Sequence, residues 1–489
     1  MNIKLSLKIL SALIVFVGVC LIIPLIISLI HHHDGEGLRL FIISSLSIII
    51  GSALFKFFKP QSKELTHKDG FFIVACGWTI FSFIGALPFY FSKYFNTFID
   101  AFFESTSGFT TTGSTILTNI ESVAPSLLFW RSLIQWLGGM GIIVLSIAIL
   151  PFLEIGGMQL YQAEVPGPTK DKLTPRIEDT AKLLWLVYFI FTVAEIILLM
   201  LGGMSLYDAT CHAFTTMATG GFSTKNASIA AYHSAYIDYV ITFFMFLAGI
   251  NFSLHYQMVF KQNLKCFLKN TEVKFYFFIN LIATLILTIS LIINKHYHTI
   301  SDAFRYAVFQ VVSIVTTTGY GTADYEKWSY LCQFLLILLM LIGGCAGSTG
   351  GGIKHIRIYV YLKYTWNQIY KIIHPNAVKN LKIEGKIIEE NIVSSILSFI
   401  ALYFLVFTIS SILLLAFGGQ DIVTSLSAVI ATLSNIGPGL GNVGPVDNFA
   451  GFTGFGKLIL SFCMIIGRLE FYTILVILAP DFWKNIKYN

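Results

Sequence analysis

The chain has 489 residues, of which 55% are hydrophobic and only 12% are charged, and its mean hydropathy is +0.75. This balance excludes a soluble globular protein and predicts a polytopic membrane protein. The formal net charge is +6, but the cations are spread among the segments between apolar runs, so no nucleic-acid partner is expected.

Ten apolar stretches are each long enough to cross a bilayer, which takes roughly 20 residues. They lie near 5–30, 38–57, 71–92, 126–152, 181–203, 235–260, 272–293, 330–342 continuing through 353–364, 391–417 and 454–480. Lysine and arginine collect in alternate connections, at 56–68, 170–182, 261–274 and 354–386. The positive-inside rule then places both termini in the cytoplasm and predicts a multi-pass protein of the cell inner (plasma) membrane.

Four short glycine-bearing stretches recur at nearly even intervals between these runs. They are TTTGST from residue 110, ATGGFST from 218, TTTGYGT from 316 and SNIGPG from 434. We align them on Gly113, Gly220, Gly319 and Gly437. Each follows a short helix-like segment, at 99–110, 206–217, 301–316 and 421–433. These segments are too short to cross the membrane, so each is predicted to enter and leave on the extracellular side as a pore loop.

The predicted fold is an all-α polytopic membrane protein with four covalently linked span–pore loop–span repeats in pseudo-fourfold arrangement, preceded by an N-terminal pair of transmembrane helices. The predicted units are 1–68 for the N-terminal pair, 69–155 for repeat 1, 156–270 for repeat 2, 271–386 for repeat 3 and 387–489 for repeat 4. The parallel order of the repeats argues against a rocking carrier, which is built from inverted repeats.

The glycine stretches are predicted to form an ion filter. A potassium filter replaces the water shell of the ion with backbone carbonyls, and glycine turns successive carbonyls by adopting positive φ. The predicted filter residues are Thr111, Thr112, Gly113, Ala218, Thr219, Gly220, Thr317, Thr318, Gly319, Asn435, Ile436 and Gly437. One such stretch alone is typical of an ordinary loop, whereas four in register between spans favour a filter.

A second glycine-rich stretch interrupts the third repeat's second span. Its glycines each cost about 0.8 to 1 kcal/mol relative to alanine within a helix, so the helix is predicted to break and to form a gating loop below the filter. The predicted gating residues there are Gly343, Gly344, Gly347, Ser348, Thr349, Gly350, Gly351 and Gly352. The alternative is close helix packing through Gly343, Gly347 and Gly351, which have small-xxx-small spacing.

Arg468 lies in the final apolar run, where a charge is costly unless it faces a polar interior. It is a predicted gating residue, acting as an electrostatic barrier, as a competitor of the ion, or as a tie to carbonyls of the broken segment. Glu470 is only two positions away and therefore a poor partner for it. Glu104 and Asp302 are interpreted as capping or pore-mouth residues rather than proton carriers.

The glycine stretches, the loop at 343–352, the GRLE segment at 467–470 and the stretch GGMQLYQAEVPGP at 156–168 resemble the Trk/Ktr/HKT superfamily of potassium transporters, over nearly the whole chain. The N-terminal pair of spans resembles the bacterial Trk membrane subunit of the TrkH/TrkG type more than the shorter Ktr type. By this resemblance the four glycines form the filter, 343–352 the intramembrane gate and Arg468 a constriction below the filter. Glycine at all four positions implies potassium rather than sodium as the transported ion.

The resemblance also implies a homodimer with one pore per protomer, docked on cytosolic TrkA-like regulatory subunits that bind nucleotide. No Walker pattern occurs in the chain, so no organic cofactor is expected on it. Membrane lipid and potassium are the remaining expected partners.

One alternative stays open: a sodium-dependent Ktr-type subunit would share the filter. An intramembrane enzyme would need an acid/base or metal constellation that the sequence does not show, so no enzymatic activity is predicted. The sequence leaves open whether flow is channel-like or a proton- or sodium-coupled symport.

Overall fold

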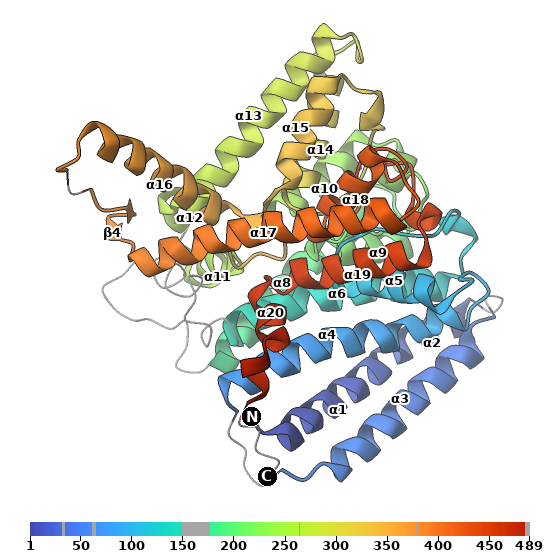
Figure 1. Ribbon diagram of the computed structural model, residues 1–489. Helices are drawn as coiled ribbons and strands as arrows, with labels where there is room; N and C mark the ends of the chain where they lie inside the picture. Colours follow the sequence, from blue (N-terminus) through green and yellow to red (C-terminus); the bar gives the residue numbers. More distant parts are fainter. Residues whose placement is uncertain (32–34, 61–64, 149–176, 264, 378, 485–489) are drawn as a thin grey trace.

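The computed structural model describes residues 1–31, 35–60, 65–148, 177–263, 265–377 and 379–484, and its elements are almost all helices (Figure 1). The N-terminal helices are α1 (Ile3–Cys20), α2 (Ile22–Ile30) and α3 (Gly37–Phe57). They lie side by side next to α4 (His67–Tyr90) at one edge of the molecule. The predicted N-terminal pair of spans is thus confirmed, with α1 and α2 together forming the first, Ile3–Ile30.

A span, a short helix and a second span then follow one another four times, as predicted. The four sets are α4, α5 (Phe98–Phe109) and α6 (Pro125–Ala148); α8 (Ile177–Leu201), α9 (Leu206–Met217) and α10 (Ala235–Ala248); α13 (Thr271–Ile293), α14 (Ile300–Val315) and α15 (Tyr330–Met340); and α17 (Glu390–Phe417), α18 (Ile422–Leu433) and α19 (Gly454–Arg468). The short helices match the predicted segments to within one residue at either end.

Each short helix begins at a side-chain cap that its sequence specifies. Thr97, Ser205 and Thr299 each accept a hydrogen bond from the backbone N–H of an aspartate three residues later, and Asp421 accepts from Val423 and Thr424. Capping of this kind satisfies N–H groups that would otherwise lack a partner inside the membrane.

Several predicted spans are bent or interrupted. Within the described residues six helices are long and apolar enough to cross a membrane, or eight if each bent pair counts as one span. The bent pairs are α10 with α11 (Phe252–Lys261), at 102°, and α19 with α20 (Tyr472–Leu478), at 114°. The sequence predicts ten crossings, and α6 and the interrupted α15 occupy the positions of the other two.

Other elements connect the second repeat to the third and the third repeat to the fourth. The short helix α12 (Lys265–Lys269) leads into α13, and α16 (His355–Ile373) projects from the body to the left in Figure 1. A hairpin of β3 (Lys382–Ile383) and β4 (Lys386–Ile387) connects α16 to α17.

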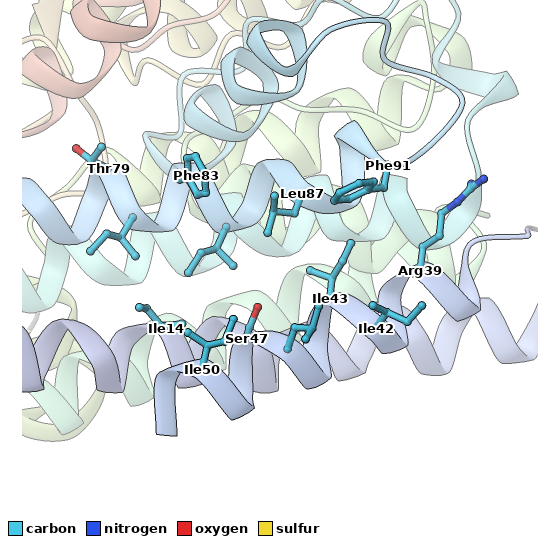
Figure 2. Close-up of a pocket in the computed structure, with 13 residues that line it drawn as sticks. Ile14, Arg39, Ile42, Ile43, Ser47, Ile50, Thr79, Phe83, Leu87 and Phe91 are labelled. Carbon is cyan, nitrogen blue, oxygen red and sulfur yellow. The ribbon is translucent and has the colours of Figure 1, made fainter. Parts of the chain in front are cut away.

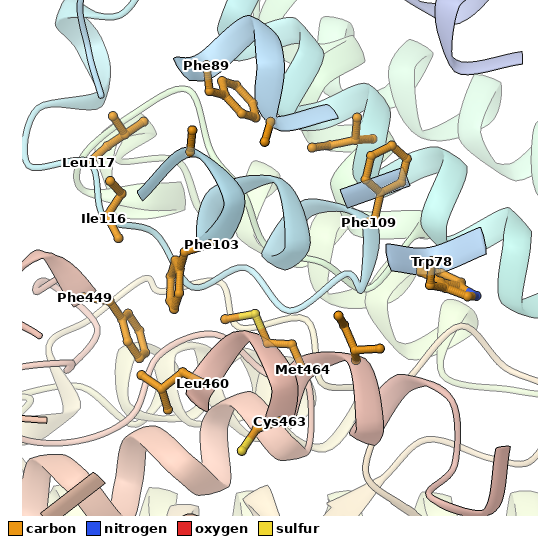
Figure 3. Packing of buried hydrophobic residues seen from close by; sticks show 14 of the residues in the cluster. Trp78, Phe89, Phe103, Phe109, Ile116, Leu117, Phe449, Leu460, Cys463 and Met464 are labelled. Atoms are coloured by element: carbon orange, nitrogen blue, oxygen red, sulfur yellow. The ribbon is translucent and has the colours of Figure 1, made fainter. Parts of the chain in front are cut away.

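The first and fourth repeats pack against each other in one buried apolar cluster (Figure 3). Phe103 of α5 faces Phe449, with 5.5 Å between ring centroids, and the buried Leu460 and Met464 of α19 belong to the same cluster. Because this contact joins segments more than 300 residues apart, it holds the first repeat against the fourth.

An almost purely apolar cavity of about 810 Å³ lies between the N-terminal helices and α4 (Figure 2). Ile43 and Ile50 of α3 face Phe83 and Leu87 of α4 across it. None of its lining residues belongs to a short helix or to a glycine stretch, so this cavity is separate from the pore loops.

Candidate filter and gate

The four chain segments that follow the short helices have the same backbone conformation. Thr111, Thr219, Thr317 and Asn435 have φ of 53°, 54°, 60° and 57°. The next residue of each repeat donates its N–H to a carbonyl of the preceding short helix at 2.8 Å; these residues are Thr112, Gly220, Thr318 and Ile436. A glycine with positive φ then follows, at Gly113, Gly221, Gly319 and Gly437.

This pattern corrects the alignment of the second repeat. The sequence aligns Gly220 with the other filter glycines, but the structure places Gly221 there, with φ of 73°. Gly220 instead occupies the position of Thr112 and Thr318, and Thr219 that of Thr111. The alignment is wrong because two consecutive glycines leave the register ambiguous, and only the backbone conformation resolves it.

The four glycines form a closed ring. A Cβ added to Gly113 would lie 2.2 Å from the carbonyl oxygen of Gly220, and one added to Gly221 would lie 1.9 Å from that of Thr318. The corresponding distances are 1.8 Å from Gly319 to the Ile436 oxygen and 2.8 Å from Gly437 to the Thr112 oxygen. Each repeat thus presents a glycine to a carbonyl of the next, and the fourth returns to the first.

A polar cavity of about 110 Å³ opens above this ring and receives residues from all four repeats, including Gly113, Gly221, Gly319 and Gly437. Beside it, the Glu326 carboxylate accepts a hydrogen bond from the backbone of Gly441 at 2.5 Å. Burial raises the pKa of the Glu326 carboxyl, and this hydrogen bond opposes the shift.

The predicted break in the third repeat is confirmed. The helix α15 ends at Met340 and α16 begins at His355, with β1 (Ile342–Gly343) and β2 (Ile353–Lys354) paired in parallel between them. A Cβ on Gly343 would lie 1.8 Å from the Gly351 carbonyl oxygen. The glycines therefore allow the two ends of the loop to approach closely. The alternative of a continuous helix packed through small-xxx-small spacing is wrong.

The loop of residues 343–352 lies against the inner ends of the pore loops. Thr349 donates to the Met217 carbonyl at the end of α9, at 3.0 Å, and the Gly351 N–H donates to the Thr317 hydroxyl at 2.8 Å. A Cβ on Gly351 would lie 2.4 Å from the Ser434 carbonyl at the end of α18. The loop thus contacts the second, third and fourth repeats.

Arg468 joins this loop to the first repeat. It is 2% exposed, and it donates to the Thr349 carbonyl at 2.6 Å and to the Gly138 carbonyl of α6 at 3.2 Å. The predicted tie between Arg468 and carbonyls of the broken segment is thus observed. A second buried cation, Lys354, which sequence reasoning did not single out for this site, donates to the Gly350 carbonyl.

The structure shows the partners of the three carboxylates considered in the sequence analysis. Glu470 pairs with Arg357 at 2.5 Å rather than with Arg468. Asp302 interacts with the capping hydroxyl of Thr299 at the start of α14. Glu104 holds the chain just after the first glycine, accepting from Thr115 at 2.8 Å and from the Ile116 N–H at 3.0 Å. The stretch at 156–168 lies outside the described residues.

Four glycine-bearing segments that meet in a ring, with a buried loop packed against them and apolar helices around them, define a helical membrane protein. Comparison with known proteins makes this more specific. The family model for TrkH, described as a cation transport protein, matches residues 37–485, and the chain belongs to this family. It is therefore a member of a family of membrane transport proteins rather than of enzymes.

Relatives match over nearly their whole length. The Trk system potassium uptake protein TrkH of Escherichia coli K12 is 41% identical, with 98% of this chain and 99% of the relative covered. The Trk system potassium uptake protein TrkG of the same organism is 35% identical, with 94% and 95% covered. The crystal structure of the potassium transporter TrkH from Vibrio parahaemolyticus superposes with a TM-score of 0.91 at 36% identity, covering 99% of this chain and 100% of that one.

Proposed function

We propose that this protein takes up potassium across the cell inner membrane through a central pore whose filter is formed by residues 111–113, 219–221, 317–319 and 435–437. The observation that carries the proposal is the closed ring in which each repeat's glycine packs against a carbonyl of the next. Rings of backbone carbonyls at membrane depth replace the water shell of a potassium ion. The relatives named as potassium uptake proteins support the choice of ion.

The short helices support a cation as the transported species. All four end at the ring, so the negative ends of their dipoles lie near it. The residue that follows the ring glycine differs among the four repeats; it is Ser114, Phe222, Tyr320 or Pro438. We therefore expect fewer well-formed ion sites than in a symmetric tetrameric channel.

We propose that residues 343–352 and Arg468 form the gate. The loop lies against the inner ends of three pore loops, and Arg468 ties it to α6 of the first repeat. In this arrangement the Arg468 guanidinium places a positive charge below the filter, which opposes the passage of a cation until the loop moves.

The resemblance to the Trk family supports a proposal for the assembly. We propose a homodimer with one pore per protomer, both termini in the cytoplasm and a cytosolic TrkA-like nucleotide-binding partner. The repeat boundaries at 68, 155, 270 and 386 remain a proposal from the sequence, and residue 155 lies outside the described residues.

The test is flux through the purified chain in liposomes, without partners, with sodium as the competing ion. We expect potassium flux to exceed sodium flux and to rise when residues 346–351 are deleted. Equal fluxes of the two ions would contradict the filter, and unchanged flux in the deletion variant would contradict the gate.

The alternative is a sodium-dependent Ktr-type subunit. The N-terminal spans α1 to α3 and the match to TrkH relatives over their full length favour the Trk type. Potassium flux that requires sodium on the same side of the membrane would favour the alternative.

A further inference from the structure

Two buried polar side chains of α6, Arg131 and Gln135, face the second repeat's filter segment. They lie four residues apart, so they share one face of the helix. Arg131 is 1% exposed and Gln135 fully buried. Neither belongs to the filter or to the loop below it.

Gln135 holds the filter segment of the second repeat through both ends of its amide. Its Nε2 donates to the Gly220 carbonyl at 2.7 Å, and its Oε1 accepts from the Phe222 N–H at 3.1 Å. The Gly220 oxygen is the one that packs against Gly113 in the ring. The Gln135 amide therefore holds the carbonyl that the second repeat contributes to the ring.

This contact also explains why glycine stands at 220. A Cβ on Gly220 would lie 2.4 Å from Cδ of Gln135, so the glutamine occupies the space that a side chain at 220 would need. The equivalent residues of the other repeats are Thr112, Thr318 and Ile436. The first glycine of the pair thus accommodates Gln135, while the second, Gly221, supplies the positive φ.

Arg131 contacts the chain segments that follow the filter glycines of the first and second repeats. Its Nε donates to Glu104 at 2.8 Å, its Nη1 to the Ser223 carbonyl at 3.2 Å and its Nη2 to the Thr115 hydroxyl at 3.3 Å. Its guanidinium carbon lies 4.0 Å from the centroid of the Phe222 ring. It therefore links the chain after the first filter glycine to the chain after the second.

We propose that Gln135, supported by Arg131, is a positioning residue for ion selectivity that holds the Gly220 carbonyl at the spacing potassium requires. The inference rests on the proposed function of the ring as a potassium filter. It assigns the discrimination between potassium and sodium in part to a side chain outside the filter sequence.

The test compares the ratio of potassium to sodium flux in liposomes for the full chain and for Gln135→Met, which keeps the side-chain volume and removes both hydrogen bonds. We expect the ratio to fall by about five- to tenfold, the change that the net value of the hydrogen bond to the Gly220 carbonyl accounts for, with potassium flux retained. Ser132→Ala is the matched control, because Ser132 is buried on the same helix and its hydroxyl bonds to the Leu128 carbonyl and to the Cys211 thiol, neither of which belongs to the filter segments. It should leave the ratio unchanged.

A second variant tests whether Gln135 acts on selectivity through the Gly220 carbonyl. Gly220→Ala should displace the flexible Gln135 amide and lower the ratio to the same extent, and the double variant with Gln135→Met should be no worse than either single one. Additive losses would overturn the proposal, as would a Gln135→Met variant that folds and keeps the wild-type ratio. A wild-type chain without potassium preference would instead contradict the proposed function itself.

Discussion

The two adjacent glycines of the second repeat give the sharpest test of the filter register. We predict that Gly221→Ala severely impairs the protein whereas Gly220→Ala leaves it folded. At Gly221 an added Cβ would lie 1.9 Å from the Thr318 carbonyl oxygen of a neighbouring repeat, on a backbone with φ of 73°. At Gly220 the three atoms nearest to an added Cβ would all belong to the end of the Gln135 side chain, which can move.

The magnitudes separate the two variants clearly. The left-handed conformation costs an alanine about 1 to 2 kcal/mol, and forcing a methyl group into a packed backbone costs about 1 to 3 kcal/mol. We therefore expect Gly221→Ala to lose about 2 to 5 kcal/mol of stability, together with ion flux. Because the Gln135 side chain can yield, Gly220→Ala should lose about 1 kcal/mol, the net value of a hydrogen bond.

The assay is thermal unfolding of the two purified variants in detergent, followed by flux in liposomes for each that folds. The result that would refute the reasoning is the opposite order, with Gly220→Ala impaired and Gly221→Ala close to the wild type. That order would restore the alignment on Gly220 that the sequence suggests.

Three further predictions follow from other contacts. Gly113→Ser should lower the stability and relax the selectivity of the remaining flux toward sodium, because its Cβ would press on the Gly220 carbonyl from 2.2 Å on a backbone with φ of 85°; an unchanged sodium-to-potassium flux ratio would contradict it. Arg468→Gln should raise basal potassium flux severalfold, since a charged hydrogen bond to the loop carbonyl is worth about 1.5 to 3 kcal/mol; flux at or below the wild-type level in the same liposomes would argue against the gate. Lys457→Met should destabilise the chain by about 3 to 5 kcal/mol, because it leaves the buried Asp100 without the Lys457 ammonium, whose Nζ lies 2.6 Å from Asp100 Oδ1. Thermal unfolding measures the loss, and the double variant with Asp100→Asn should recover most of it.

The sequence predicts the local structure well where the determining signals are local. The apolar runs locate the spans, and each short helix begins where Thr97, Ser205, Thr299 or Asp421 provides a cap. The loop between α15 and α16 is likewise predictable, because its concentration of glycines makes a continuous helix unfavourable. These features depend on residues within one or two helical turns of each other.

Two other features were decided only by contacts between distant segments. The sequence predicts continuous spans at 235–260 and 454–480, whereas both are sharply bent in the structure. In the second bend Glu470 and Phe471 adopt positive φ, and Glu470 pairs with Arg357 of α16. Composition alone does not reveal this pairing, since the two residues are far apart along the chain.

The register of the second pore loop shows the same division. The sequence determined that a glycine turn follows α9, but Gly220 and Gly221 are chemically identical and either could adopt the left-handed conformation. The choice was made by two residues of other repeats, Gln135, which fills the space beside Gly220, and Thr318, whose carbonyl lies against Gly221. Local sequence thus fixed the elements of this protein, while the tertiary structure set the ring, because the ring exists only where four separate segments meet.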